Sequence, residues 1–426
     1  MTKIRQALVD MNPWWEGGFR AGYKEREIYG TLQKFMRLPQ IMALTGLRRV
    51  GKTTLMLKMA EDAIRRGLDP RSIVYFSFDE FGEANIRGIL EEYEAASENS
   101  LRKGKYLVML DEIQKVENWE DQLKAIYDLF KGTVKIVISG SESLFIRKKS
   151  KETLAGRIFE FKVEPLSFRE FLIFRGFDFR PIGLHERELR RLFDDFILTL
   201  GFPELADVRD KDVIKKYVKE SIVEKVVYRD IQGLFRVKDV SVIESLLNIM
   251  MEEPGQIMEV SEIGRQLGVS RQTASIYLSY LEKSFLIRKL YNYSKSRRKV
   301  ERKLKKYYPA IVSAELLFKD DDQSKSKVFE WAIVNEMRPD FFWRDPYKNE
   351  VDIILPGRKP LPIEIKYGKT GTKGLLPFME KTGAKEGYVV SRKEEGMQKA
   401  GNKTIHIIPA FRFLLERPWL KQAKSA

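Results

Sequence analysis

Short apolar runs alternate with stretches of helical periodicity along the first part of the chain. Residues 41–45 (Ile-Met-Ala-Leu-Thr) form one such run, and apolar positions recur with helical spacing from there to about residue 66. Further apolar runs, typical of buried strands, occupy residues 72–78, 106–110 and 134–139. Because parallel strands are connected by helices and covered on both faces, this alternation predicts a parallel α/β sheet.

The pattern changes after Pro165. Helical stretches at 167–174, 186–200 and 212–230 predict a lid, and strand and helix patterns alternate again near the C-terminus. Near the N-terminus, a polar helix is expected to end near Pro39. Because 426 residues are too many for one hydrophobic core, we expect a core domain with this parallel sheet at 1–165, a lid at 166–237, a helix-turn-helix segment at 238–308 and a last domain at 309–426.

A phosphate-binding loop follows the first predicted strand. Its residues match G-x-x-x-x-G-K-[ST] and lie between an apolar strand and a helix, as this motif requires. Backbone N–H groups of such a loop surround phosphates at the start of a helix. The predicted ATP-binding residues are Gly46, Leu47, Arg48, Arg49, Val50, Gly51, Lys52, Thr53 and Thr54.

Acidic and polar residues at the ends of other strands complete this predicted site. Lys52 would neutralise the phosphates, while Thr53 and Asp111 would hold Mg²⁺. Glu112, which follows Asp111, would orient and deprotonate the attacking water. The fourth strand ends in Ser139-Gly140-Ser141, where Ser139 is favoured over Ser141 as a γ-phosphate sensor, unless the serine is only part of a turn.

Arg157 lies in the sequence Leu154-Ala155-Gly156-Arg157. It is a candidate arginine finger that would enter the site of a neighbouring subunit. A solvated arginine is the alternative.

Residues 261–273 have the pattern of a helix-turn-helix. One predicted helix ends at Gly268, and Ser270 caps a second helix whose apolar face would be formed by Ile276, Leu278 and Leu281. A wing strand is expected at 284–290. The predicted DNA contacts, on the second helix and in the basic stretch of the wing, are Arg271, Gln272, Ser275, Arg297, Arg298 and Lys299. A protein-interaction module is the alternative.

Carboxylates and a lysine near the C-terminus form a nuclease-like pattern. Glu330 lies on a predicted helix at 327–337, and a turn at 356–360 would fold the strands that carry Asp352, Glu364 and Lys366 into a hairpin. With Asp352 and Glu364 as ligands, such a group could hold Mg²⁺ and activate water for phosphodiester cleavage. The alternative is a nuclease-derived domain that serves binding or assembly and whose charged residues are simply paired.

Composition limits the chemistry and the partners. The chain has no cysteine and two histidines, so disulfides and thiolate zinc sites are excluded and histidine-based sites are disfavoured. A formal charge of +16 favours nucleic acid as a partner. No apolar stretch has the length of a membrane helix, and no signal pattern precedes the first domain, so a cytoplasmic protein without membrane association is expected. The abundant Lys, Arg and Glu fit a thermophile.

In order, these motifs resemble those of prokaryotic, especially archaeal, AAA+ ATPases with a C-terminal domain similar to PD-(D/E)xK nucleases. The resemblance implies a P-loop AAA+ parallel sheet with a helical lid, a winged helix-turn-helix and a restriction-endonuclease-like α/β domain. It also implies ATP-driven assembly as a homo-oligomer, such as a hexameric ring, and work on DNA. Many relatives have degenerate nuclease residues, whereas this chain keeps all four. It departs from them at Tyr308-Pro309-Ala310, where many have an aspartate. Motifs that carry the resemblance include Asn12–Trp15, Gly46–Thr53, Asp111–Glu112, Gly201–Glu204, Tyr228–Asp230 and the set Glu330, Asp352, Glu364 and Lys366.

These observations lead to one main functional hypothesis and two alternatives. The main hypothesis is an ATP-hydrolysing, DNA-binding motor that processes DNA, with a Mg²⁺-dependent nuclease in its last domain. One alternative is a nucleotide-gated signalling or regulatory switch. The other is a role in protein assembly, or a toxin-like role, in which the last domain contacts only protein.

Overall fold

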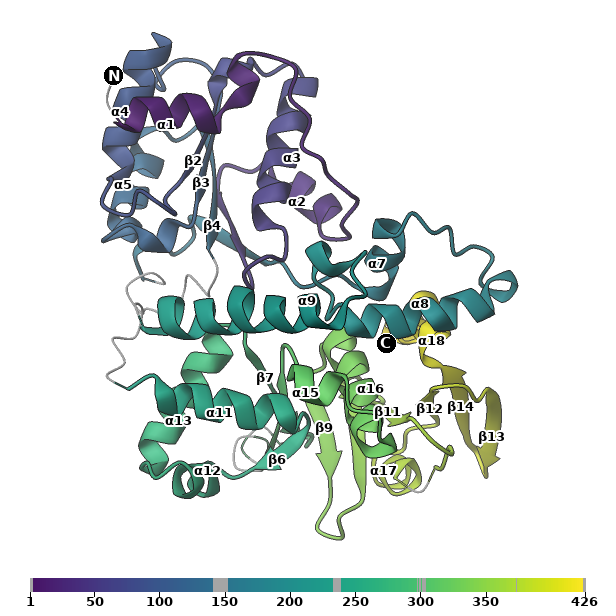
Figure 1. Cartoon of the computed structure of the whole chain (residues 1–426). Coiled ribbons are helices and arrows are strands. Elements are labelled where there is room, and N and C mark those ends of the chain that lie inside the picture. The colour runs from purple at the N-terminus through teal and green to yellow at the C-terminus, as the bar shows by residue number, and fades with distance from the viewer. Residues whose placement is uncertain are drawn as a thin grey trace. The chain divides into compact units, whose positions relative to one another are not determined.

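The computed structural model describes residues 3–140, 152–232, 239–296, 298, 300, 304–372 and 374–423, without the side chains of residues 229, 230 and 421–423. The chain divides into two compact units, Met1–Pro165 and Leu166–Ala426 (Figure 1). Within the described part of the chain, every helix is too short or too polar to cross a lipid bilayer.

A parallel five-stranded sheet forms the centre of the first unit, in the order β2-β3-β4-β1-β5. Its central strands are buried on both faces, as expected for a parallel sheet covered by helices. The predicted parallel α/β sheet is therefore confirmed. Its strands are β1 (Ile41–Thr45), β2 (Ile73–Ser77), β3 (Tyr106–Asp111), β4 (Val134–Gly140) and β5 (Ile158–Lys162).

The fifth strand was not predicted. β5 is an edge strand whose side chains are half-buried or exposed, and Glu160 and Lys162 interrupt its apolar residues. A strand of this composition lacks the continuous apolar run that marks the other four.

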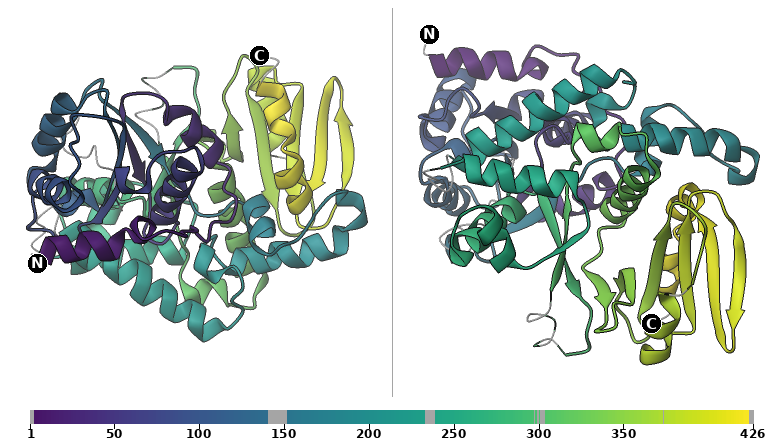
Figure 2. Two further views of the ribbon diagram at one scale, coloured as in Figure 1. Left: turned by 90° about the horizontal axis from the view of Figure 1, so that it is seen from above. Right: turned by 60° about the horizontal axis from the view of Figure 1, so that its bottom comes forward.

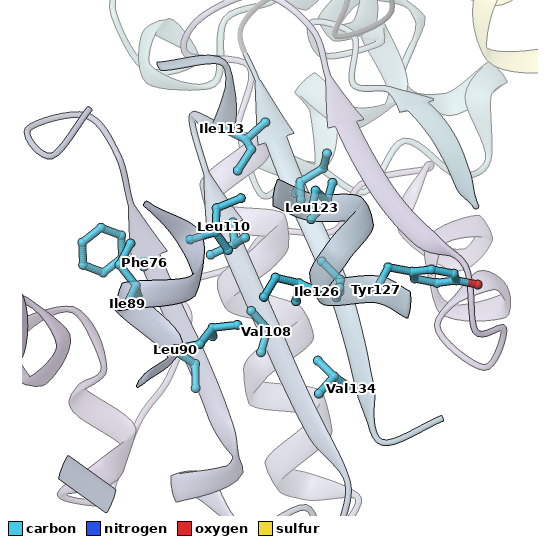
Figure 3. Packing of buried hydrophobic residues seen from close by; sticks show 14 of the residues in the cluster. Phe76, Ile89, Leu90, Val108, Leu110, Ile113, Leu123, Ile126, Tyr127 and Val134 are labelled. Carbon is cyan, nitrogen blue, oxygen red and sulfur yellow. The ribbon is translucent and has the colours of Figure 1, made fainter. Parts of the chain in front are cut away.

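Helices cover both faces of this sheet. Side chains of α4 and α5 pack with Phe76, Val108 and Leu110 on one face (Figure 3), and α1 belongs to the same hydrophobic cluster. Helix α3 contacts β3 and β4 on the other face (Figure 1). The helical segments are α1 (Lys3–Met11), η1 (Pro13–Trp15), α2 (Tyr29–Phe35), α3 (Lys52–Arg65), η2 (Pro70–Ser72), α4 (Ile86–Ser97), η3 (Ile113–Lys115) and α5 (Trp119–Leu129).

The polar helix expected between Trp15 and Pro39 is mostly absent. Residues 17–28 are irregular, and only α2 is helical there. Gly17, Gly18 and Gly22 all have positive φ, which a right-handed helix does not accommodate.

The second unit begins with helices. A capping box between Ser167 and Glu170 starts the first of them, where Glu170 N donates to Ser167 Oγ at 3.1 Å and Ser167 N to Glu170 Oε2 at 2.9 Å. Its helical segments are α7 (Phe168–Phe174), η4 (Ile182–Leu184), α8 (Glu186–Leu198), η5 (Pro203–Leu205), α9 (Lys211–Lys216), the π-helical η6 (Tyr217–Val223) and η7 (Lys225–Ile231), α11 (Ser241–Glu252), α12 (Val260–Gln266), α13 (Arg271–Lys283), α15 (Ala314–Leu317), α16 (Asp322–Met337), α17 (Leu375–Thr382), α18 (Ala410–Glu416) and α19 (Pro418–Ala423).

One nine-stranded mixed sheet, β13-β14-β12-β11-β10-β9-β7-β8-β6, extends through the second unit. A parallel pairing of Tyr291 with Phe341 joins β7 to β9, so segments expected in two different domains share this sheet. Figure 2 shows α18 beside β12 and β14, which it contacts. The strands are β6 (Gln256–Met258), β7 (Ile287–Asn292), β8 (Lys305–Pro309), β9 (Phe341–Arg344), β10 (Glu350–Leu355), β11 (Leu361–Lys366), β12 (Glu386–Ser391), β13 (Gly396–Ala400) and β14 (Lys403–Pro409).

We predict that Gly46→Ala destabilises the first unit. Gly46 has φ of +144°, and a Cβ there would lie 2.2 Å from the carbonyl oxygen of Val163, which follows β5. We expect a loss of about 1–3 kcal/mol in unfolding free energy, measured by calorimetry of the full chain. As a control, Gly30→Ala in α2 meets open space and should be neutral or stabilise by up to about 1 kcal/mol. Equal effects of both changes would contradict this account of Gly46.

Candidate nucleotide site and carboxylate cluster

The predicted phosphate loop links β1 to α3. Gly51 adopts a left-handed conformation and directly precedes Lys52, the first residue of α3. Lys52 is only 5% exposed, and its Nζ donates to the carbonyl oxygens of Gly46 at 3.1 Å and Leu47 at 2.8 Å. The loop therefore folds around the ammonium group at a helix N-terminus, the arrangement that favours anions. Of the other loop residues, Leu47 and Val50 are buried, Arg48 is half-buried and Arg49 is exposed.

Arg26, which the sequence analysis missed, holds the phosphate loop through hydrogen bonds to backbone carbonyl oxygens. Its guanidinium donates to the carbonyl oxygens of Val50 and Glu164, both at 2.7 Å. The side chain is buried and connects the phosphate loop to the chain that follows β5. Nothing in the sequence around Arg26 distinguishes it from a solvated arginine.

The carboxylate of Asp111 is the meeting point of three hydroxyl groups. Thr53 Oγ1 donates to Asp111 Oδ2 at 2.7 Å, Tyr75 OH donates to the same oxygen at 2.8 Å, and Ser139 Oγ donates to Oδ1. Asp111 is 3% exposed. Because a buried carboxylate is costly without partners, these donors stabilise it in one orientation.

Tyr75 is a second residue that the sequence analysis missed. The register of β2 and β3 places Ser77 beside Asp111, and Tyr75 lies two residues earlier on the same face. Burial, and then the charge of Asp111, raise the pKa of Tyr75. The phenol therefore stays protonated and donates to the carboxylate.

Glu112 and Ser139 adjoin Asp111. Glu112 N donates to Ser139 Oγ at 3.3 Å, and Gln114 Nε2 donates to Glu112 Oε2 at 2.6 Å. Glu112 has φ of +55°, an uncommon conformation for a residue other than glycine. Ser139 pairs with Leu44 of β1, so it lies near the start of the phosphate loop. Ser141, the alternative sensor, lies outside the described residues.

The donor set at this site fits Mg²⁺ and a nucleoside triphosphate. Thr53 and Asp111 place two oxygen atoms 2.7 Å apart beside the loop that holds Lys52. Mg²⁺ prefers such oxygen ligands together with phosphate oxygens.

Arg157 lies at the opposite end of the strands from the phosphate loop. It precedes β5, whose first residue pairs with the first residue of β1, whereas the phosphate loop follows the last residue of β1. Its Nε is 3.1 Å from Asp128 Oδ1 of α5. Any contact of Arg157 with a nucleotide would therefore have to involve a neighbouring subunit.

Helices α12 and α13 are joined by a tight turn. Val269 N donates to the carbonyl of Gly264 at 2.9 Å, and a Cβ on Gly264 would lie 2.8 Å from Val269 O. Ser270 caps α13, accepting from Thr273 N at 3.0 Å.

The exposed face of α13 carries the three predicted contacts of this helix, Arg271, Gln272 and Ser275. The expected apolar face needs a correction, because Ile276 is 40% exposed while Leu278 and Leu281 are buried. Ala274 takes its place, since positions 274, 278 and 281 recur with helical spacing.

The basic residues after β7 differ in exposure where the structure describes them. Arg298 is exposed, whereas Arg297, Lys299, Arg302 and Lys303 lie outside the described residues. Beyond this stretch, the side chain of Lys306 is buried and only 4% exposed. It points from β8 into the group of carboxylates of the predicted nuclease-like site.

This carboxylate cluster consists of Glu330 of α16, Glu350 and Asp352 of β10, and Glu364 of β11. Lys306 Nζ lies 2.9 Å from Glu330 Oε1, 3.0 Å from Glu350 Oε1 and 3.3 Å from Asp352 Oδ1. The hairpin of β10 and β11 forms as expected, with Ile353 opposite Ile363.

The remaining oxygens of the cluster have further partners. Asp352 Oδ2 accepts from Ile365 N at 2.9 Å, and Glu330 Oε1 accepts from Tyr308 OH at 2.6 Å. Lys366 Nζ donates to Glu364 Oε1 at 2.6 Å. The structure thus brings the four predicted residues together and adds Lys306, Glu350 and Tyr308 to them. Lys306 and Tyr308 lie two residues apart on β8 and therefore share a face of that strand. The sequence analysis placed both residues in or at the end of a basic stretch and did not predict this strand.

Burial and mutual charge set the protonation of this cluster. Burial, with a smaller contribution from the charge of Glu330, raises the pKa of Asp352 to about 6. Burial, with a smaller contribution from the charge of Asp352, raises the pKa of Glu364 to about 8. Burial would lower the pKa of Lys306, but Glu330 and the other anionic neighbours hold it well above its ordinary value. Lys306 is therefore a permanent cation in the cluster.

The cluster does not fit a preformed Mg²⁺ site. Both oxygens of Asp352 have donors, and an ammonium group contacts three of the four carboxylates. Among the described residues, no three His, Cys, Asp or Glu side chains are grouped to hold a metal ion.

Three family models match parts of the chain. Residues 38–172 match an AAA domain, residues 190–310 a domain of unknown function (DUF8612), and residues 327–413 another domain of unknown function (DUF4143). The chain is similar to an uncharacterized protein of Haemophilus influenzae, with 28% identity over 59% of this chain and 62% of that protein, slightly less than two thirds of its length. It is also similar to two uncharacterized proteins of Methanocaldococcus jannaschii. One is 25% identical over 77% of this chain and 75% of that protein, and the other is 25% identical over 88% and 85%.

Solved structures show more distant likeness. AMPPCP-bound DnaA from Aquifex aeolicus is 15% identical, with a TM-score of 0.31 over 64% of this chain and 92% of that one. The Saccharomyces cerevisiae Hsp104–ADP complex is 15% identical, with a TM-score of 0.34 over 78% of this chain and 46% of that one. The family match and the parallel sheet around the phosphate loop together identify residues 38–172 as an AAA-type ATPase domain.

Proposed function

We propose that the first unit binds and hydrolyses ATP with Mg²⁺ and that the second unit couples this hydrolysis to DNA. The observation that carries the proposal is the 2.7 Å contact of Thr53 with Asp111 beside the loop that encloses Lys52. A hydroxyl and a carboxylate from two distant segments meet there, next to a cation at a helix N-terminus. This combination serves phosphoryl transfer.

Each residue of the site has a separate role in this proposal. The ammonium of Lys52 leaves the loop carbonyls and neutralises the phosphates. Thr53 and Asp111 hold Mg²⁺, which neutralises charge on the phosphates when it is bound. Glu112 accepts a proton from water, and Gln114 holds its carboxylate in place. Ser139, which donates to Asp111, senses the γ-phosphate in this proposal.

We further propose that α13 contacts duplex DNA. Three features support this: the exposed polar face of α13, the exposed Arg298 after β7 and the formal charge of +16. A winged helix-turn-helix would place Arg271 and Gln272 against base edges and the basic stretch against phosphates. A homo-oligomer, such as a hexameric ring, is proposed because only another subunit could receive Arg157 at its nucleotide site.

DNA cleavage by the carboxylate cluster has less support. Asp352, Glu364 and Lys366 lie together, but the ammonium of Lys306 contacts the carboxylates that would bind Mg²⁺. We therefore propose that the last domain binds without cutting. DNA-stimulated ATP hydrolysis would separate this function from the signalling switch, which requires nucleotide binding but no such stimulation.

We predict that Lys52→Ala reduces ATP hydrolysis by at least about 100-fold, because the phosphates lose their main cationic partner. Glu112→Gln should reduce hydrolysis by a similar factor, about 100-fold, while the protein still binds a labelled ATP analogue. Lys58→Ala is the control, since Lys58 lies on the same helix but pairs with Glu61 and Asp62. Turnover by the Lys52→Ala protein at the normal rate would refute the proposed site.

We predict that Tyr75→Phe lowers ATP turnover roughly tenfold, because Asp111 loses one donor to its charged oxygen. Steady-state kinetics at saturating ATP and varied Mg²⁺ would show a weaker response to Mg²⁺. Tyr93→Phe is the matched control, because its hydroxyl donates to Arg71 O, away from Asp111. Equal losses in both variants would mean that Tyr75 contributes only to stability.

We predict that Arg271→Ala weakens binding of duplex DNA by about tenfold. Fluorescence anisotropy over a range of salt concentrations would measure this, together with DNA stimulation of ATP hydrolysis. Arg265→Ala is the control, since Arg265 pairs with Glu262 at 2.6 Å on α12. Unchanged DNA affinity in the Arg271 variant would favour a protein partner for this helix.

A further inference from the structure

Lys306 contacts three carboxylates of the cluster at once. It comes from β8, outside the segment that carries the nuclease-like motif, and its ammonium contacts one carboxylate of α16 and two of β10. All three N–O distances are between 2.9 and 3.3 Å. Tyr308, two residues later on the same strand, donates to Glu330 and is fully buried.

Burial confines the side chain of Lys306 to the carboxylate cluster. The side chain is 4% exposed, so it cannot turn to solvent without opening the cluster. The backbone at Gly374 also lies close to the cluster, because a Cβ there would be 2.4 Å from Glu350 O and 3.4 Å from Glu364 Oε2. Space beside the carboxylates is therefore restricted.

One carboxyl group of the cluster is only partly satisfied. Glu364 Oε2 is buried and has no hydrogen-bond partner, although Lys366 occupies Oε1 of the same carboxylate. The four carboxyl groups have three cationic partners, since Lys306 and Lys366 are joined by Arg344, which lies 3.8 Å from Glu350. The cluster thus has the composition of a cation site, and a lysine supplies the cation.

We infer that Lys306 is the resident cation of the carboxylate cluster and excludes divalent metal from it. Removal of the Lys306 ammonium would leave Glu330, Asp352 and Glu364 as oxygen ligands for a hard divalent cation. Lys306 is then the residue that decides whether this domain is a metal site. The inference does not depend on ATP hydrolysis by the first unit.

Binding of Mn²⁺ to the full chain, followed by electron paramagnetic resonance of free Mn²⁺, tests this inference. All proteins carry Asp111→Asn and contain no nucleotide, so that the first unit contributes no such site. With Lys306 intact, Asp352→Asn should leave Mn²⁺ binding unchanged. Lys306→Ala should add about one tightly held Mn²⁺ per chain, and Asp352→Asn in that background should remove it.

Two further comparisons keep the test decisive. Lys306→Arg retains the positive charge and should bind no additional Mn²⁺. If Lys306→Ala does not fold, as judged by calorimetry, the proteins with Lys306 intact still decide the question. A Mn²⁺ ion that binds with Lys306 in place and is lost in Asp352→Asn or Glu364→Gln would overturn the inference. So would a folded Lys306→Ala protein that gains no Mn²⁺.

Discussion

The hydrogen bonds that converge on Asp111 determine the organisation of the first unit. Thr53 approaches from the helix after the phosphate loop, Tyr75 from β2 and Ser139 from β4, on both sides of β3. Only the end of an inner strand in a parallel sheet can be reached from both neighbouring strands and from the following layer of helices. A buried carboxylate without these donors would be unstable, so the position of the loop and the order of the strands are linked through one side chain.

The sequence predicted those parts of the structure whose signal is local. The phosphate loop, the four apolar strands and the hairpin of β10 and β11 each lie within a short continuous segment. Arg26, Tyr75 and Lys306 were missed because their roles arise from contacts with residues far along the chain. An arginine in an irregular segment or a lysine in a basic run has no local mark of burial. The exposure of Ile276 has the same origin, since Ala274 fits the helix face that packs inward and is too small to stand out in an apolar pattern.

Asp111 and Asp352 show two different solutions to the burial of a carboxylate. Asp111 accepts from neutral hydroxyl groups, so its negative charge is stabilised but not cancelled. Asp352 accepts from a backbone N–H and from the ammonium of Lys306, which cancels charge within the cluster. A carboxylate that keeps its charge attracts a cation from solution, whereas one with a fixed ammonium partner does not need one. The two sites therefore differ in charge balance for a reason that motif content alone does not reveal.

The shared sheet of the second unit and Lys306 together join the helix-turn-helix segment to the last domain. β8 pairs with β6 and β7, beside the helix-turn-helix segment, while its Lys306 and Tyr308 side chains reach Glu330 of α16. β7 in turn pairs with β9, so backbone hydrogen bonds and buried ion pairs join the same two regions. Separation of these regions would break a sheet and leave three carboxylates without their common cation, which is costly in a buried setting. The helix-turn-helix segment and the last domain should consequently behave as one rigid body, with α13 in a fixed position relative to the carboxylate cluster.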